Sequence, residues 1–245
     1  MQDRKVVFIT GGAKRIGATI ARHAHKAGMN VVIHYHRSET DAHALQAELN
    51  RQRADSALLL QADLHNVSKL NSMVHQVIEY YGHLDVLVNN ASSFYPTPVG
   101  NITEHDWDDL LGTNVKTPLF LSQAAAPHLA KTEGCIINLA DIHAERPLKA
   151  HPVYSIAKAG IVMLTKSLAK ELGPHVRVNA IAPGVILWPQ KEMDEVTQQR
   201  IISMIPLKRQ GDPNDIAQVA LFLMQDANYI TGQVIAVDGG RTVNQ

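Results

Sequence analysis

Cysteine, aromatic side chains and an excess of either charge are what this sequence has little of. Its 245 residues include one cysteine and 5% aromatic residues, and 23 basic residues are balanced by 23 acidic ones. A single cysteine excludes a disulfide framework and a cysteine-based zinc site, and it fits a reducing compartment. Zero net charge argues against nucleic acids or anionic membranes as partners, because such binders usually carry a basic excess.

Long hydrophobic runs are missing as well. No stretch of 18 apolar residues could form a membrane span and no signal peptide is visible, so we expect a cytoplasmic protein. The 13 histidines are scattered without metal-ligand spacing, and we predict no metal site. No linker, repeat or low-complexity segment interrupts the chain. We therefore predict one domain over residues 1–245.

What the sequence does contain is a regular alternation of short apolar runs with stretches of helical period. The predicted strands are Lys5–Thr10, Asn30–Tyr35, Ser56–Gln61, Asp85–Asn89, Cys135–Leu139, Val176–Ile181 and Val234–Val237. The predicted helices are Arg15–Ala27, Thr40–Arg53, Val67–Tyr81, Thr103–Leu110, Lys116–Lys131, His151–Leu172 and Asp212–Met224. Such alternation favours parallel strands that are covered on both faces. The expected fold is α/β, a Rossmann-like doubly wound sheet of about seven strands in a three-layer arrangement.

A glycine turn, Gly11–Gly17, follows the first predicted strand and opens the first helix. In a doubly wound fold this turn binds a dinucleotide, because the helix N-terminus offers free N–H groups and a positive dipole end to the pyrophosphate. Arg15 stands where the motif has its middle glycine, which places a guanidinium beside the phosphates. The motif alone is weak, since an ordinary strand-to-helix turn can share it.

The end of the second strand indicates which dinucleotide binds. An NAD-binding protein has Asp or Glu there for the ribose hydroxyls, whereas this chain has His36-Arg37-Ser38. Arg37 and Ser38 suit a 2′-phosphate, which a carboxylate would repel. We therefore predict NADPH, with a solvated loop cation as the alternative for Arg37. Asp63 is placed to contact adenine or, alternatively, to cap the helix that begins at Val67.

Tyr154 and Lys158 are four residues apart near the start of a long predicted helix, so they lie on one face. A phenol has an ordinary pKa near 10, and a nearby ammonium stabilises the phenolate and lowers that value. The pair is therefore suited to proton donation near neutral pH. Because this spacing is common by chance, it gains weight only together with the glycine turn, Asn89-Asn90-Ala91 and Asn114.

With these motifs the chain resembles the short-chain dehydrogenase/reductase family over essentially its whole length. The resemblance implies hydride transfer from a nicotinamide, with Tyr154 as the proton donor and Lys158 assisting. It also implies that Asn114 holds a water between Lys158 and solvent. The cofactor-binding residues that we predict are Gly11, Arg15, Ile16, Gly17, Tyr35, His36, Arg37, Ser38, Asp63, Leu64, Asn90, Ala91, Ser92, Tyr154, Lys158, Pro183 and Gly184.

Asp141 is the main departure from the family pattern, which has a serine thirteen residues before the tyrosine. A carboxylate cannot donate a hydrogen bond unless protonated, and it would repel a developing alkoxide. It suits a substrate with N–H groups or one that gains a proton at a ring nitrogen. Together with Arg15, the end of the second strand and the run Asn90–Pro98, Asp141 makes the chain similar to the pteridine reductases.

That resemblance implies NADPH-dependent reduction of dihydropterins, and in addition of oxidised pterins or dihydrofolate. The pterin would stack between the nicotinamide and Phe94, although Phe94 packing within a loop is the alternative. Leu187 and Trp188 either line the substrate site or cap the fold. The substrate-binding residues that we predict are Arg15, Ser92, Phe94, Asp141, Tyr154, Leu187 and Trp188.

Two other functions remain open at this point. One is a carbonyl reductase, for example of 3-oxoacyl thioesters, and the other is a non-catalytic NADPH-binding protein. The irregular segment Ala182–Pro206, which is helical near Thr197–Met204, fits a lid or binding loop. Family relatives are commonly homotetramers, so the resemblance implies a homotetramer packed through the helices that start near Lys116 and His151.

Overall fold

A computed structural model describes residues 4–188 and 194–243 and shows one parallel sheet. Its order is β3-β2-β1-β4-β5-β6-β7, and every pairing in it is parallel. The strands are β1 (Val6–Ile9), β2 (Asn30–Tyr35), β3 (Ala57–Gln61), β4 (Val86–Asn89), β5 (Cys135–Leu139), β6 (Arg177–Pro183) and β7 (Val234–Val237). The predicted seven-stranded doubly wound sheet is confirmed.

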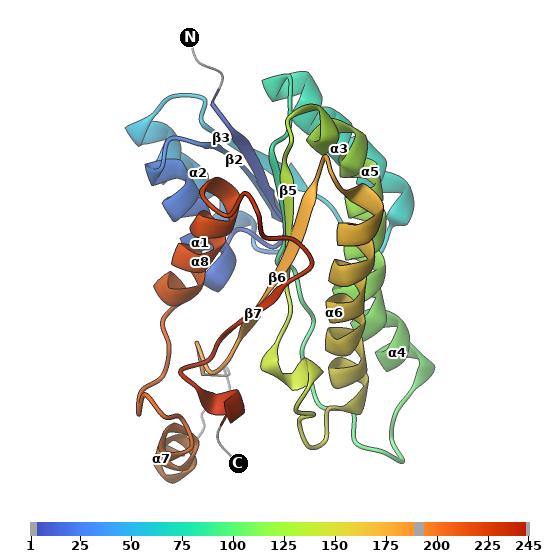
Figure 1. The fold of residues 1–245 in the computed structure, drawn as a ribbon, viewed down its shortest axis with the longest axis vertical. Helices are drawn as coiled ribbons and strands as arrows, with labels where there is room; N and C mark the ends of the chain where they lie inside the picture. Colours follow the sequence, from blue (N-terminus) through green and yellow to red (C-terminus); the bar gives the residue numbers. More distant parts are fainter. Residues whose placement is uncertain (1–3, 189–193, 244–245) are drawn as a thin grey trace.

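Helices cover both faces of the sheet, which gives three layers (Figure 1). One face carries α1 (Arg15–Lys26), α2 (Glu39–Gln52) and α8 (Pro213–Gln225). The other carries α3 (Val67–Tyr81), α4 (Glu104–Leu111), α5 (Thr117–Lys131) and α6 (Pro152–Leu172). Within the described ranges, no helix is both long enough and apolar enough to cross a membrane.

The strands form because both of their faces are buried. On β1, Val7 and Ile9 pack into the core beneath α1 and α8, whereas Val6 and Phe8 pack beneath α3 and α5. All four side chains are fully buried. Alternating side chains of a strand point to opposite faces, so a strand buried on both sides is apolar throughout.

A π-helical turn, Gly112–Lys116, joins α4 to α5 as one continuous helix. A capping box starts α4, because Thr103 Oγ1 accepts a hydrogen bond from the Asp106 N–H (3.1 Å) and Asp106 accepts from the Thr103 N–H (2.9 Å). The sequence predicts two helices here with a break between Leu110 and Lys116. The wide turn instead carries Asn114 inward, and such π-bulges commonly occur at functional sites.

The C-terminal ends of the strands lie along one edge of the sheet, and the order of the strands along the sheet reverses at β1. β1 lies between β2 and β4, so the sheet grows one way through β3 and the other way through β7. Ligands of doubly wound proteins bind outside the strand ends at this reversal. The irregular segment begins after Pro183, where β6 ends, and contains α7 (Glu195–Ser203) as expected. Its positions 189–193 lie outside the described residues.

Candidate active site

A cleft of about 720 Å³ opens at the C-terminal ends of the strands. It runs from the β1–α1 turn and the end of β2, past the β4 and β5 loops, to the start of α6 and the end of β6. The predicted residues that line it are Gly11, Arg15, Ile16, Gly17, His36, Arg37, Asp63, Leu64, Asn90, Ala91, Ser92, Phe94, Asp141, Tyr154, Lys158, Pro183, Gly184 and Leu187.

Four predicted residues are not part of this lining: Tyr35, Ser38, Asn114 and Trp188. Tyr35 is 6% exposed and packs into the α1–α2 side of the core, because strand alternation places it with Ile33. Its ring lies 6.4 Å from that of His43, edge to face. Ser38 is the N-cap residue of α2, and Asn114 is buried behind the cleft wall.

The glycine turn leaves no room for side chains at two of its positions. A Cβ on Gly17 would stand 2.5 Å from Gly11 O and 2.6 Å from Asn90 Nδ2. Gly11 has φ +59°, and a Cβ on it would stand 3.1 Å from Ala91 Cα. Asn90 closes the turn, since its Nδ2 donates to Thr10 O and Gly11 O, both at 2.9 Å. The backbone here can therefore approach a ligand closely.

Arg15 adopts a backbone conformation that L-residues rarely take, with φ +52° at the first position of α1. A left-handed conformation costs a residue with a Cβ roughly 1–2 kcal/mol. Glycine would avoid this cost, so the arginine is a strained choice. Its side chain is exposed and lines the cleft. Backbone strain retained at such a position points to a functional guanidinium.

Two amides of the turn are bonded to the protein itself. The Gly11 N–H donates to Nδ1 of His34 (3.1 Å), and the Gly12 N–H donates to the His34 carbonyl (2.9 Å). The free donors are those of the first turn of α1, where Ile16 and Gly17 have no intrahelical acceptor. These N–H groups, with Arg15, fit a pyrophosphate group.

The opposite rim of the cleft carries His36 and Arg37, both exposed. Asp63 faces them, and it accepts a hydrogen bond from the His65 N–H (3.0 Å). That bond, together with the charges of His36, His65 and Arg37, lowers the pKa of Asp63 below its usual value. Asp63 does not cap α3, whose N-cap residue is Asn66. A cationic rim without a carboxylate at the end of β2 suits a phosphorylated ribose.

Tyr154 and Asp141 form the central pair of the cleft. The Tyr154 hydroxyl donates to Asp141 Oδ2 at 2.8 Å, while Asp141 Oδ1 accepts from the His143 N–H at 2.8 Å. Asp141 thereby caps the short 3₁₀ helix Ile142–Ala144. Burial, and then the charge and hydrogen bond of Asp141, raise the pKa of Tyr154 well above its usual range. The expected lowering by Lys158 is therefore wrong for this arrangement, and Tyr154 is a protonated phenol.

Lys158 lies below this pair, 3% exposed. Its Nζ donates to the Leu139 carbonyl at 2.9 Å and lies 5.6 Å from the centre of the Tyr154 ring. Burial lowers the pKa of Lys158 to about 8, and the charge of Asp141 opposes that shift. The ammonium is thus fixed by a carbonyl at the end of β5 rather than by the phenol.

The π-helical turn places Asn114 against the loop that follows β4. Asn114 Nδ2 donates to Ser93 O (3.0 Å) and Leu110 O (2.9 Å), and its Oδ1 accepts from Ser92 Oγ (2.7 Å). All of these partners belong to the protein, so the side chain orders the loop that carries Ser92. The water-holding role implied by resemblance stays a prediction.

Phe94 presents an exposed ring to the cleft, with 49% of its surface accessible. The ring meets Tyr154 edge to face, with centroids 4.8 Å apart. One face stacks on His151, which starts α6, at 4.9 Å and an interplanar angle of 11°. The aromatic surface that remains is suited to stacking against a flat heterocycle.

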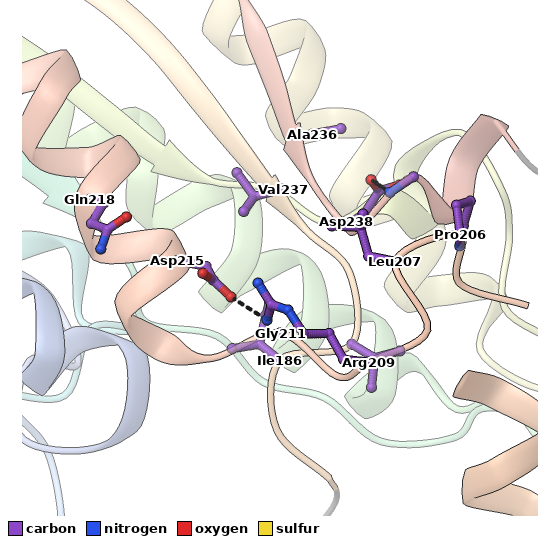
Figure 2. Close-up of a pocket in the computed structure, with 13 residues that line it drawn as sticks. Ile186, Pro206, Leu207, Arg209, Gly211, Asp215, Gln218, Ala236, Val237 and Asp238 are labelled. Atoms are coloured by element: carbon purple, nitrogen blue, oxygen red, sulfur yellow. Dashed lines mark hydrogen bonds and ion pairs between the residues drawn. The ribbon is translucent and has the colours of Figure 1, made fainter. Parts of the chain in front are cut away.

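A second cavity of about 510 Å³ lies behind the cleft wall, between the α7–α8 loop and the end of β7 (Figure 2). Its charged side chains are engaged: Arg209 pairs with Asp215 at 3.1 Å, and Asp238 accepts from backbone N–H groups. The same loop supports the cleft wall, because Gln210 Nε2 donates to Ile186 O (2.9 Å). We therefore interpret the residues around this cavity as structural support for the cleft wall.

Sequence reasoning missed several polar residues that shape the cleft. His34 is inside an apolar strand, and Thr10, whose Oγ1 accepts from the Asn90 and Ala91 N–H groups, ends another. His65 and Asp109, 3.1 Å apart, also line the cleft. A buried histidine that interrupts a run of valine and isoleucine was the one available signal, and it did not reveal the partner.

The comparison with family models gives the site its context. A model described as enoyl-(acyl carrier protein) reductase matches residues 11–242, nearly the whole chain. The chain belongs to the short-chain dehydrogenase/reductase family. Short-chain dehydrogenases/reductases are oxidoreductases that use NAD(P)H, and the cleft of this one has the turn, the free amides and the rim that such a cofactor needs.

Individual relatives of this short-chain dehydrogenase/reductase fall into two groups. Pteridine reductase 1 of Leishmania tarentolae is 36% identical, covering 98% of this chain and 97% of that protein. A 3-oxoacyl-[acyl-carrier-protein] reductase, FabG, of Staphylococcus aureus is 35% identical, covering 98% and 99%. A putative ketoacyl reductase 2 of the granaticin polyketide synthase from Streptomyces violaceoruber is also 35% identical, covering 97% and 96%. Overall identity thus favours neither group.

Proposed function

We propose that this enzyme is an NADPH-dependent pteridine reductase. The observation that carries the proposal is the Tyr154–Asp141 pair at 2.8 Å beside the exposed ring of Phe94. A carboxylate at this position accepts N–H groups and repels an oxyanion. A pterin offers ring N–H groups to such a carboxylate and a flat surface to Phe94. Its reduction places the incoming proton on a ring nitrogen, so no oxyanion develops beside the carboxylate.

The chain's own residues then divide the work. Phe94 stacks on the pterin, Ser92 and Arg15 bind polar edges of the heterocycle, and Leu187 lies at the wall of the site. NADPH, when bound, supplies the hydride. Tyr154, kept protonated by burial and by Asp141, holds the proton that the ring nitrogen gains. Asp141 fixes that proton donor through its hydrogen bond, and Lys158, held by the Leu139 carbonyl, places a positive charge near the Tyr154 ring.

The rim of the cleft supports NADPH rather than NADH as the proposed cofactor. Arg37 has no ion-pair partner among the residues that the structure describes, and His36 lies beside it. A 2′-phosphate would neutralise this rim, whereas a free ribose hydroxyl would leave the charge unmatched. Asp63 and Leu64 line the cleft where the adenine is expected.

The deciding experiment follows NADPH oxidation at 340 nm with purified protein. We expect turnover with dihydrobiopterin, dihydromonapterin or dihydrofolate, and little with a 3-oxoacyl thioester. Turnover with the thioester alone would overturn the proposal. Binding of NADPH without turnover of any substrate would instead identify a non-catalytic NADPH-binding protein.

A 3-oxoacyl thioester reductase is the second candidate, because the Staphylococcus aureus reductase is 35% identical over nearly full lengths of both chains. Asp141 opposes this activity, since its carboxylate offers no hydrogen bond to the developing oxyanion and repels it. The variant Asp141→Ser therefore separates the two. If the wild-type enzyme is a pteridine reductase, Asp141→Ser should lose pterin turnover. Its turnover of a 3-oxoacyl thioester should rise above that of the wild type.

We also propose a cytoplasmic homotetramer that packs through the outer faces of α4, α5 and α6 (Figure 1). These faces expose large apolar side chains: Trp107, Leu119, Ile156 and Met163. Clusters of exposed apolar side chains commonly mark interfaces between subunits. Light scattering after size-exclusion chromatography tests this, with a mass near four times 26.9 kDa expected. A monomer would contradict it.

A further inference from the structure

His34 stands out because it is a histidine buried in the sheet, 2% exposed, directly after the apolar run Val31–Ile33 of β2. It lies beneath the cleft at the level of the glycine turn and lines the cleft floor. Neither the catalytic pair nor the cationic rim uses it. Its ring nevertheless has a specific partner at each nitrogen.

The two partners determine where the ring proton lies. A backbone N–H only donates, so the bond from Gly11 N to Nδ1 (3.1 Å) requires an unprotonated Nδ1. A carbonyl only accepts, so Nε2 carries the hydrogen and donates to Ala62 O (3.1 Å). Burial also lowers the pKa of His34 to about 4, while the nearby His36 and Asp63 have opposing effects. The ring is therefore neutral with a single tautomer at pH 7.

We propose that His34 is a positioning residue that joins the phosphate-binding turn to the adenine side of the cofactor site. Through Nδ1 it fixes Gly11, which has a left-handed backbone, and through Nε2 it fixes Ala62 next to Asp63. The inference rests on the proposed cofactor site but not on pterin as the substrate. The His34 side chain thus sets the distance between two loops that must bind the same ligand.

The spacing matters because the two loops come from different strands. Gly11 follows β1 and Ala62 follows β3, and β2, which carries His34, lies between them. The backbone of His34 adds a third link by accepting from the Gly12 N–H. Without the ring, the Gly11 N–H loses its buried acceptor and the turn is no longer held in one conformation. Binding would then have to restore the order that His34 supplies in advance.

Three substitutions separate the two links. His34→Asn keeps an acceptor near the position of Nδ1, His34→Gln keeps a donor near that of Nε2, and His34→Leu removes both. His25→Leu is the matched control, because His25 is equally buried (3% exposed) but bonds Ser56, away from the cleft. Dissociation constants for NADPH are measured by quenching of protein fluorescence, without any substrate.

We expect His34→Leu to weaken NADPH binding about tenfold or more, as the loss of one or two buried hydrogen bonds implies. His34→Asn should retain most of the affinity, and His25→Leu should bind as wild type does. Amide hydrogen exchange without NADPH should show faster exchange at Gly11 in His34→Leu and His34→Gln, but not in His34→Asn.

Wild-type affinity and unchanged Gly11 exchange in His34→Leu would overturn the inference. If His34→Leu does not fold, equal affinity and equal exchange in the Asn and Gln variants would overturn it instead. Failure of the wild-type protein to bind NADPH would sink the cofactor proposal, yet the Gly11 exchange pattern would still test the role of His34 in the turn.

Discussion

At the scale of single residues, Asp141 uses two separate oxygens for two partners, where a serine would have a single oxygen. One oxygen accepts from a backbone N–H and fixes the start of a short helix, and the other holds the Tyr154 proton. A carboxylate has lone pairs for both partners and needs no proton of its own. The departure from the family pattern is therefore consistent with a local structural requirement as well as with the choice of substrate.

Replacing Asp141 by alanine should lower kcat for a pterin by about a hundredfold or more, within the range of general acid–base effects. The dissociation constant for NADPH should stay within about twofold, because Asp141 lies at the catalytic end of the cleft. Asp141→Asn is the control, since its side-chain oxygen can still cap the helix. Steady-state kinetics with wild-type values in Asp141→Ala would refute the role of the carboxylate.

Arg15 offers a second test at this scale, because its backbone favours glycine and its side chain faces the cleft. Arg15→Gly should raise the free energy of unfolding by up to about 1 kcal/mol, since relief of strain exceeds the added entropy of the unfolded chain. It should also weaken NADPH binding about tenfold. Urea denaturation and fluorescence titration measure the two effects.

The matched control is Glu133→Gly, at an exposed residue with φ +50° that does not line the cleft. It should gain similar stability without any change in NADPH affinity. Loss of stability in Arg15→Gly, or affinity equal to that of wild type, would show that Arg15 is not a strained functional residue.

At the scale of elements, the start of α1 depends on close contact between the turn and the loop after β4. Gly17→Ala would place a Cβ 2.5 Å from Gly11 O and 2.6 Å from Asn90 Nδ2. Both atoms are fixed by hydrogen bonds, so the turn must open. We expect NADPH binding to fall at least a hundredfold, or to be lost, with the far-ultraviolet circular dichroism largely retained.

Gly160→Ala, in α6, is the control for Gly17→Ala. It also adds a methyl group inside a helix, where it meets only the Val115 side chain at 3.1 Å. We expect that variant to bind NADPH normally. Equal binding by both variants would contradict the close packing of the turn.

The bounds of some helices and strands could be predicted from the sequence, whereas other features could not. The bounds of β2, α3, β5 and β7 were predicted to the residue, because apolar runs and helical periods are local signals. The π-helical turn around Asn114 was not, since its extra residue per turn leaves no periodic trace. Tyr154 and Lys158 were found from their spacing. The bond between His34 and Gly11 joins residues 23 positions apart, so no local pattern encodes it.

At the scale of the whole molecule, His34 makes stability depend on pH. Burial lowers its pKa from 6.5 to about 4. Between pH 4 and 6.5, His34 binds a proton in the unfolded chain but stays neutral in the folded chain. The free energy of unfolding therefore falls as pH decreases from 6.5 to 4. The contribution of this one group is roughly 3 kcal/mol. Below pH 4 both states are protonated and the loss levels off.

Urea denaturation of wild type and His34→Asn between pH 4 and 7.5 measures this contribution. The stability advantage of wild type should shrink by roughly 3 kcal/mol as the pH falls through that window. His25, whose pKa burial also lowers, is present in both proteins and cancels in the difference. An advantage that stays constant with pH would contradict the neutral buried ring.

The commitment of the Gly11 and Gly12 amides to His34 has a consequence for the forces that hold the cofactor. Fewer neutral backbone donors are left for the phosphates, so more of the attraction must come from the full charges of Arg15 and Arg37. Both side chains are exposed, and charges in water are screened over about 10 Å at 0.1 M salt. We therefore expect the affinity for NADPH to fall as ionic strength rises, even though the chain as a whole has no net charge.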